Sequence, residues 1–198
     1  MLFDVHKIEE LASNRVRFVS FNYDRSLECF LHEATKNAYG VEDEIAIREW
    51  SKLAILHVYG SLGKFCFQPM NDGRIYRSEL SQQDLAIASS GIRVIPEARD
   101  DDDNFALARN WFDWATRIYF LGFGFDPLNI RRLDLASVIE AINPQQRKLT
   151  TVYASTFGLT DAEASVGKAA LCAGHQKFHL GNPSWKNLQF IREYALLP

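Results

Sequence analysis

The sequence is poor in the features that mark several common classes of protein. Its 198 residues include only three cysteines, which lie far apart and lack a Cys-x-x-Cys spacing. Such cysteines are typical of buried thiols in a reducing compartment, and they argue against disulfides and a structural zinc site. The formal net charge of −3 offers no basic footprint for nucleic acid. No apolar stretch resembles a membrane span or a signal peptide, so we expect a soluble cytoplasmic protein.

The sequence does contain enough apolar material for one folded core. Hydrophobic residues make up 47% of the chain and charged residues 24%, which is the balance of a globular domain. We find no internal repeat and no long linker. We therefore expect residues 1–198 to form a single domain.

Apolar runs alternate with helical patterns along the chain. Strands are predicted at 16–21, 53–58, 117–121 and 149–154. Amphipathic helices are predicted between and after them, at 24–40, 43–52, 79–89, 104–116, 161–173 and 184–197. Asp24 and Gly40 are expected to cap the first helix, and Thr160 and Glu163 form a capping box. The alternation predicts the α/β class: a Rossmann-like three-layer fold with a mostly parallel central sheet flanked by helices.

Polar and small residues follow the first two predicted strands. Asn22 and Asp24 come after the first, and the second ends at His57, followed by Tyr59-Gly60-Ser61. Ligands of open parallel sheets bind outside the carboxyl ends of the strands. The pattern therefore predicts a nucleotide-type site. The alternative is that Asn22 and Asp24 only end a strand and cap the next helix.

Small residues also follow the third and fourth strands. Gly122 and Gly124 stand between a strand and a helix that would present free N–H groups to a ligand. The third glycine of the dinucleotide fingerprint is missing, so a tight strand-to-helix turn explains the pattern equally well. Ser155 ends the fourth strand and is suited to lining the adenosine half of a nucleotide.

No metal site is expected. His175 and His179 have the spacing of metal ligands, but glycines bracket them in a loop or strand rather than a helix. The four aspartates at 100–103 lack the alternating spacing of a calcium loop. They are better explained as a solvated loop that caps the following helix.

Three segments, taken in order, resemble the sirtuins and the sirtuin-like domains of bacterial defence proteins. These proteins bind NAD, and many of them cleave its glycosidic bond to nicotinamide. The segments that carry the resemblance are Phe21-Asn22-Tyr23-Asp24, Val58-Tyr59-Gly60-Ser61-Leu62 and Leu121-Gly122-Phe123-Gly124-Phe125-Asp126-Pro127. The resemblance implies an NAD-binding domain, active as an NAD glycohydrolase in antiphage defence, with NAD as substrate or ligand.

The resemblance also implies roles for individual residues. Asn22 would contact the ribose and the attacking group near the scissile bond, and the second catalytic residue that we expect, His57, is not at the family's position and follows from the strand geometry given below. Asp24 would help to hold the nicotinamide end. The cofactor-binding set implied in this way is Asp24, Tyr59, Gly60, Ser61, Gly122, Gly124, Asp126, Asn129 and Ser155.

The chain departs from the family pattern at its second motif. The family places a histidine, the base that acts on the ribose hydroxyls, where this chain has Tyr59. His57 lies two residues earlier and hence on the same face of the strand. A neutral imidazole accepts a proton near pH 7, whereas a tyrosine does not. Either His57 substitutes as the base or catalysis is lost, and a histidine in an apolar strand is also a common core residue.

The second departure is the missing phosphate loop. Sirtuin-like domains open with a glycine-rich loop, but the first glycine of this chain is Gly40. This absence predicts a domain truncated at its N-terminus, or an inactive scaffold that binds a partner protein, another copy of itself or another nucleotide. Lysine deacylation is less favoured, because the chain has no paired Cys-x-x-Cys motif. The expected ligand is therefore NAD or an ADP-ribose-like nucleotide, with no nucleic acid or membrane as partner.

Overall fold

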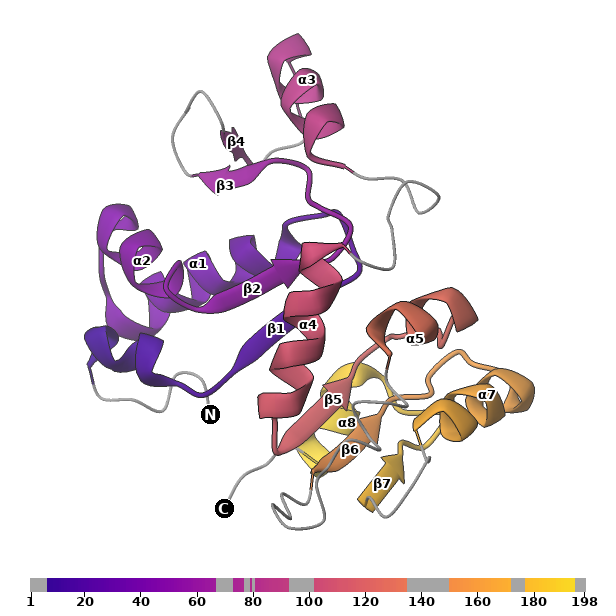
Figure 1. Cartoon of the computed structure of the whole chain (residues 1–198). Coiled ribbons are helices and arrows are strands. Elements are labelled where there is room, and N and C mark those ends of the chain that lie inside the picture. The colour runs from indigo at the N-terminus through magenta and orange to yellow at the C-terminus, as the bar shows by residue number, and fades with distance from the viewer. Residues whose placement is uncertain are drawn as a thin grey trace. The chain divides into compact units, whose positions relative to one another are not determined.

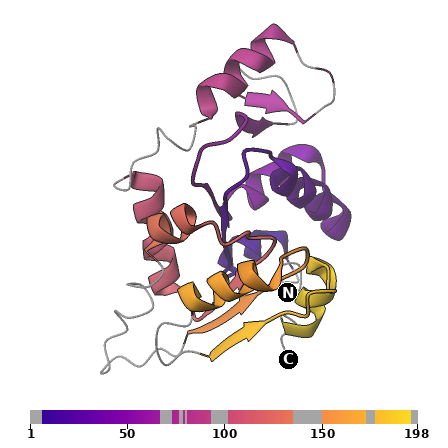
Figure 2. The ribbon, with the colours of Figure 1, turned by 90° about the vertical axis from the view of Figure 1, so that its right-hand side faces the viewer.

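The computed structural model describes residues 7–66, 73–76, 79, 81–92, 102–134, 150–171 and 177–194. The chain divides into two compact units, Met1–Asn104 and Phe105–Pro198. Figures 1 and 2 show the elements of each unit. That the whole chain forms one domain stays a prediction.

The first unit is built around a pair of parallel strands. Its elements are η1 (Ile8–Ser13), β1 (Arg17–Ser20), α1 (Ser26–Tyr39), α2 (Asp43–Trp50), β2 (Ala54–His57), β3 (Lys64–Cys66), β4 (Gly73–Ile75) and α3 (Gln82–Gly91). β1 pairs with β2 in parallel, and Ser20 lies opposite His57. β3 and β4 form a second parallel pair. The register of β1 and β2 brings the residues that follow both strands to the same edge.

The second unit contains a three-stranded parallel sheet of order β5-β6-β7. Its elements are α4 (Asp103–Trp114), which begins in the last two residues of the first unit, β5 (Arg117–Phe120), α5 (Pro127–Leu133), β6 (Thr151–Ala154), α7 (Asp161–Leu171), β7 (Lys177–Leu180) and α8 (Asn187–Tyr194). The sheet carries a ladder of stacked rings, in which Tyr153 lies 4.8 Å from Tyr119 and 5.0 Å from His179 between ring centroids. Tyr194 of α8 packs against this ladder.

The α/β class is confirmed, because helices alternate with strands whose ladders are all parallel in the part of the chain described. Each of the four predicted strands is present. Gly40 ends α1 with φ of +62°, as predicted. Thr160 and Glu163 form the predicted capping box, in which the Glu163 N–H donates to Thr160 Oγ1 and the Thr160 N–H to Glu163 Oε2.

The predicted start of α1 is corrected by one residue. Arg25 occupies the N-cap position, and its side chain makes no capping hydrogen bond. Asp24 precedes it, and Asp24 Oδ1 accepts a hydrogen bond of 2.9 Å from the Ser26 N–H. Gly174, His175 and aspartates 100 and 101 lie outside the described residues. Asp102 Oδ1 accepts from the Asn104 N–H in the first turn of α4, which agrees with the capping role predicted for that cluster.

The core of the first unit joins α1 and α2 to the sheet. Leu11, Leu31, Trp50 and Leu53 form its buried centre, with Leu27, Ile47, Ile55 and Phe65 packed around it. His32 is buried beside this core. Its Nδ1 accepts from Trp50 Nε1 (3.3 Å), so its Nε2 carries a proton and donates to Asp43 Oδ1 (2.8 Å). This chain of bonds ties α1 to both ends of α2.

The turn that follows β2 is closely packed against the end of α3. Gly60 has φ of +82° and forms an isolated antiparallel bridge with Ile92. The Ser61 N–H donates to the Gly91 carbonyl (3.1 Å). A Cβ atom built on Gly60 would lie only 2.0 Å from that carbonyl oxygen. Gly60 is therefore required both by its backbone conformation and by space.

We expect Gly60→Ala to destabilise the protein more than the matched variant Gly40→Ala. Both glycines have positive φ, but a Cβ on Gly40 would meet nothing within 4 Å. Gly40→Ala should therefore cost about 1–2 kcal/mol from backbone strain alone. Gly60→Ala should cost about 2–5 kcal/mol, because overpacking adds to the strain. Urea unfolding followed by circular dichroism measures both, and equal losses would contradict the packing described for Gly60.

Candidate functional site

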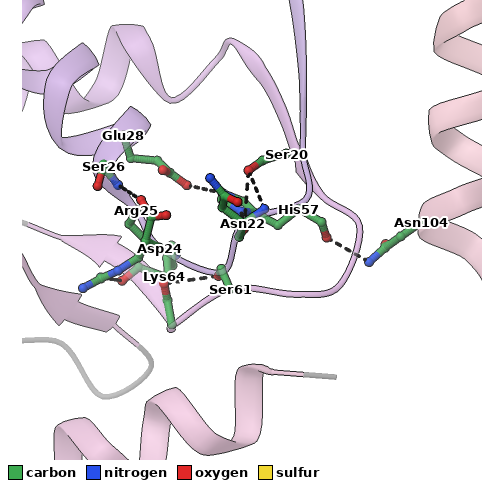
Figure 3. A network of polar contacts seen from close by, with 11 residues as sticks. Ser20, Asn22, Asp24, Arg25, Ser26, Glu28, His57, Ser61, Lys64 and Asn104 are labelled. Atoms are coloured by element: carbon green, nitrogen blue, oxygen red, sulfur yellow. Dashed lines mark hydrogen bonds and ion pairs between the residues drawn. The ribbon is translucent and has the colours of Figure 1, made fainter. Parts of the chain in front are cut away.

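The candidate site of the first unit lies at the carboxyl ends of β1 and β2. Figure 3 shows its polar network. Six of the predicted residues belong to this unit: Asn22, Asp24, His57, Tyr59, Gly60 and Ser61. The parallel register places His57 opposite Ser20, two residues before Asn22. The residues that follow the two strands therefore lie at the same edge of this sheet.

The backbone of Asn22 is held on both sides. Its N–H donates to Ser20 Oγ (3.2 Å), and its carbonyl oxygen accepts from His57 Nδ1 (2.7 Å). Asn22 itself is exposed. A fixed backbone with an exposed amide gives a group that can offer both a donor and an acceptor to a ligand.

His57 bridges two acceptors. Its Nε2 donates to Glu28 Oε1 (2.8 Å), and its Nδ1 donates to the Asn22 carbonyl. The side chains of His57 and Glu28 are only 10% and 12% exposed. A carbonyl and a carboxylate both need a donor, so this geometry suits the doubly protonated imidazolium.

The electrostatics of the site support the same protonation state. Burial lowers the pKa of His57, but the hydrogen bonds to Glu28 and to the Asn22 carbonyl, with the charges of Glu28 and Asp24, outweigh it. The net effect raises the pKa of His57 above its ordinary value. Neither ring nitrogen is left to accept a proton from a substrate. The predicted role of His57 as a base stays a prediction, and the geometry favours a positioning role.

Asp24 presents a carboxylate at the rim of the site. Hydrogen bonds from the Ser26 side chain and backbone, together with the positive charge of His57, lower the pKa of Asp24. The residue is exposed. Asp24 is therefore ionised at neutral pH, and it remains accessible to a cationic or hydroxyl-bearing ligand.

The second motif contributes packing rather than an open lining. Tyr59 is 2% exposed, and its ring lies beside Phe21 (6.1 Å between centroids) and Tyr23 (6.4 Å). Ser61 Oγ donates within its own turn to the Gly63 carbonyl (3.4 Å). Tyr59 thus belongs to the core of the unit, so a ligand would have to enter this packing to contact its ring.

The remaining predicted residues lie in the second unit, where β5 and β6 end. Gly122 has φ of +62°, and its N–H donates to the buried Ser155 Oγ (2.9 Å). Gly124 lacks a positive φ, and a Cβ atom added to it would meet nothing within 4 Å. The glycine turn is therefore explained locally at Gly122, whereas nothing in the structure requires glycine at position 124.

The start of α5 corrects one expectation. The sequence predicted a helix with free N–H groups for a ligand. In the structure Asp126 Oδ1 accepts from the N–H groups of Leu128 (2.9 Å) and Asn129 (3.1 Å). The chain's own carboxylate therefore occupies the position that a phosphate would need. Asp126 and Asn129 are a helix cap and its donor, and their predicted role in cofactor binding stays a prediction.

Sequence reasoning missed Glu28 and Asn104. Asn104 Nδ2 donates to the His57 carbonyl (3.3 Å), which fixes the end of β2 from a second direction. Glu28 lies one helical turn beyond Asp24, beside the apolar Leu27 and Leu31 of α1. An acidic residue among core positions was the available signal. Its partner, however, lies 29 residues away and follows only from the pairing of β1 with β2.

The part of the chain that the structure describes holds neither a metal-binding cluster nor a membrane-spanning helix. No three of its His, Cys, Asp or Glu side chains are grouped so that they could hold a metal ion. None of its helices is both long and apolar enough to cross a membrane. Comparison of the chain with protein-family models, curated proteins and solved structures gave no significant match.

We expect the His57–Glu28 pair to stabilise the protein most at lower pH. The folded protein holds the His57 proton more tightly than the unfolded chain does, because the pKa of His57 is raised. The contribution is therefore full below about pH 6.5, the ordinary pKa of histidine, and is lost as the pH rises through the higher folded-state value.

His57→Gln tests this expectation. The variant should cost about 2 kcal/mol at pH 6, the size of a hydrogen bond to a charged group. The cost should shrink as the pH is raised toward about 8.5, where the imidazole of the unfolded chain is neutral. Urea unfolding of both proteins across this range, kept above the pH at which the carboxylates titrate, measures the difference. A cost that does not change with pH would show that His57 is not charged in the folded protein.

Proposed function

We propose that this chain is a sirtuin-like nucleotide-binding domain that takes NAD or an ADP-ribose-like nucleotide at the ends of β1 and β2. The observation that carries the proposal is the exposed Asn22, held by Ser20 and His57 at the edge where two parallel strands end. The order of the three motifs, which resembles sirtuin-like domains, supports the choice of nucleotide. NAD binding itself is an inference from this chemistry.

The groups at this edge suit the nicotinamide riboside half of NAD. The Asn22 amide can donate to and accept from ribose hydroxyls. The nicotinamide ring of NAD carries a positive charge, and the ionised carboxylate of Asp24 offers it an opposite one. No glycine precedes Gly40, so the diphosphate lacks the glycine-rich loop that would cradle it in the family.

Hydrolysis of NAD, in a defence reaction of the kind carried out by sirtuin-like proteins, is the second candidate. Water would add to the ribose carbon, the bond to the nicotinamide nitrogen would break, and the bonding electrons would leave with nicotinamide while the water gives up a proton. Asn22 would orient the water, and the Asp24 carboxylate would ease the positive charge that develops on the ribose. The step needs an acceptor for the proton, and His57 already donates from both ring nitrogens.

The geometry of His57 therefore favours binding over turnover. A domain that binds NAD or ADP-ribose without cleaving it would act as a sensor. The alternative function is an inactive scaffold, which would have the same fold but would bind a partner protein or another copy of itself instead of a nucleotide. Binding measurements separate these functions.

Calorimetric titration of the whole chain with NAD and with ADP-ribose is the direct test. We expect both to bind, and Asn22→Ala to weaken ADP-ribose binding about tenfold, the loss of one or two hydrogen bonds. Asn37→Ala, which changes an exposed asparagine on α1, is the matched control and should leave affinity unchanged. Absence of binding by the unmodified chain would overturn the proposal, and the inactive scaffold would then be the favoured function.

A nicotinamide-release assay on the same samples tests the second candidate. We expect no release by the unmodified chain at neutral pH, because its histidine is held as a double donor. Release that disappears in both His57→Ala and Asn22→Ala would instead establish the glycohydrolase. The assay is meaningful only with protein whose binding has been measured in the same preparation.

A further inference from the structure

Glu28 brings a largely buried carboxylate to the candidate site, and the proposed function gives it no role. Its Oε1 accepts from His57 Nε2 (2.8 Å). Its Oε2 is buried and has no hydrogen-bond partner among the described residues. A half-satisfied buried carboxylate in the first turns of α1 costs stability.

The contacts of Glu28 form a relay that ends at Asn22. Glu28 holds the His57 ring, the opposite nitrogen of that ring holds the Asn22 carbonyl at 2.7 Å, and Ser20 Oγ holds the Asn22 N–H at 3.2 Å. The His57 carbonyl is held by Asn104 in turn. Figure 3 shows that the relay runs from α1 across the end of β2 to the turn after β1. The exposed residue of the site is thus fixed from the buried side.

We propose that Glu28 is a positioning residue: through His57 it fixes the Asn22 main chain and so aims the Asn22 amide at the ligand. The inference rests on the proposed nucleotide site. Glu28 does not contact the nucleotide in this scheme. It sets the orientation of the residue that does.

Both hydrogen bonds of the relay form only when the His57 ring has the right protonation state. The two ends of the relay are acceptors, so the ring needs a proton on each nitrogen. A glutamine at position 28 changes this requirement, because its amide can turn and donate to Nε2. A neutral His57 protonated at Nδ1 then still donates to the Asn22 carbonyl. An alanine at position 28 leaves nothing to hold the far side of the ring.

The test therefore compares Glu28→Ala with Glu28→Gln in the whole chain. We expect Glu28→Ala to weaken ADP-ribose binding up to about tenfold, the loss expected for Asn22→Ala, because Glu28 acts on the ligand only through Asn22. Glu28→Gln should stay within about twofold of the unmodified chain, because it can rebuild the relay. Glu33→Ala, which removes an exposed carboxylate from the same helix, is the matched control and should have no effect.

A measurement without nucleotide separates this inference from the proposed function. In nuclear magnetic resonance spectra, both ring nitrogens of His57 should be protonated at about pH 6 in the unmodified chain, and only Nδ1 at about pH 7.5 in Glu28→Gln. The amide resonances of Asn22 and Tyr23 should move in Glu28→Ala and stay close to their original positions in Glu28→Gln. If Glu28→Ala does not fold, Glu28→Met fills the same volume without a hydrogen-bonding group and replaces it.

The results distinguish the proposed nucleotide binding from the positioning role of Glu28. If the unmodified chain binds neither nucleotide, the proposed function fails, and amide shifts at Asn22 in Glu28→Ala still test the relay. Unchanged Asn22 resonances in Glu28→Ala would overturn the relay whatever the binding shows. Shifted resonances with unchanged ADP-ribose affinity would overturn the role of Glu28 in aiming Asn22 at the ligand.

Discussion

The arrangement of the first unit's site depends on one imidazole ring. His57 ends β2, and its two nitrogens join a carboxylate of α1 to the backbone of the turn after β1. Three elements of the fold therefore meet at a single side chain. The parallel register that sets Ser20 opposite His57 makes this possible, because it brings both strand ends to one edge. If the ring is moved, the Asn22 carbonyl loses its hydrogen bond from Nδ1, and the Asn22 backbone keeps only the hydrogen bonds of Ser20.

This arrangement makes His57 poorly suited to act as a catalytic base. A histidine beside an asparagine and an aspartate at the ends of parallel strands invites comparison with catalytic bases. The structure instead places acceptors on both sides of the ring, where a base would need one open nitrogen. His32 of α1 shows the contrast: one of its nitrogens accepts from Trp50 and the other donates to Asp43. The two histidines of this unit therefore differ in their hydrogen-bonding roles because their neighbours differ.

Local sequence signals predicted the elements but not the contacts of the site. Apolar runs located β1, β2, β5 and β6, although in the structure β1 and β2 are only partly buried and burial alternates along β5 and β6. Gly40 marked the end of α1 because its left-handed backbone conformation favours glycine. Each of these signals depends only on residues that are close together in the sequence.

The unpredicted features arise between distant segments. The role of Glu28 depends on the strand register, and the burial of Tyr59 depends on the rings of Phe21 and Tyr23 from another strand end. The Asp126 cap illustrates a different error. The sequence indicates the glycine turn before α5. It does not indicate whether the first N–H groups of the helix bind a ligand or a side-chain carboxylate, and in the structure they donate to Asp126.

The close approach of Gly60 to Gly91 has a consequence for the segment between them. The segment begins at Ser61 and ends at Gly91, where the Ser61 N–H donates to the Gly91 carbonyl. β3, β4 and α3 thus form an excursion whose two ends already touch, so its closure costs little additional entropy when its length changes. The excursion also contacts the start of α1, through Arg25 to the Lys64 carbonyl and Ser26 to the Tyr76 hydroxyl. A change in the length of this segment would therefore alter the rim of the site at little entropic cost, while Phe65 of β3 stays packed against the core.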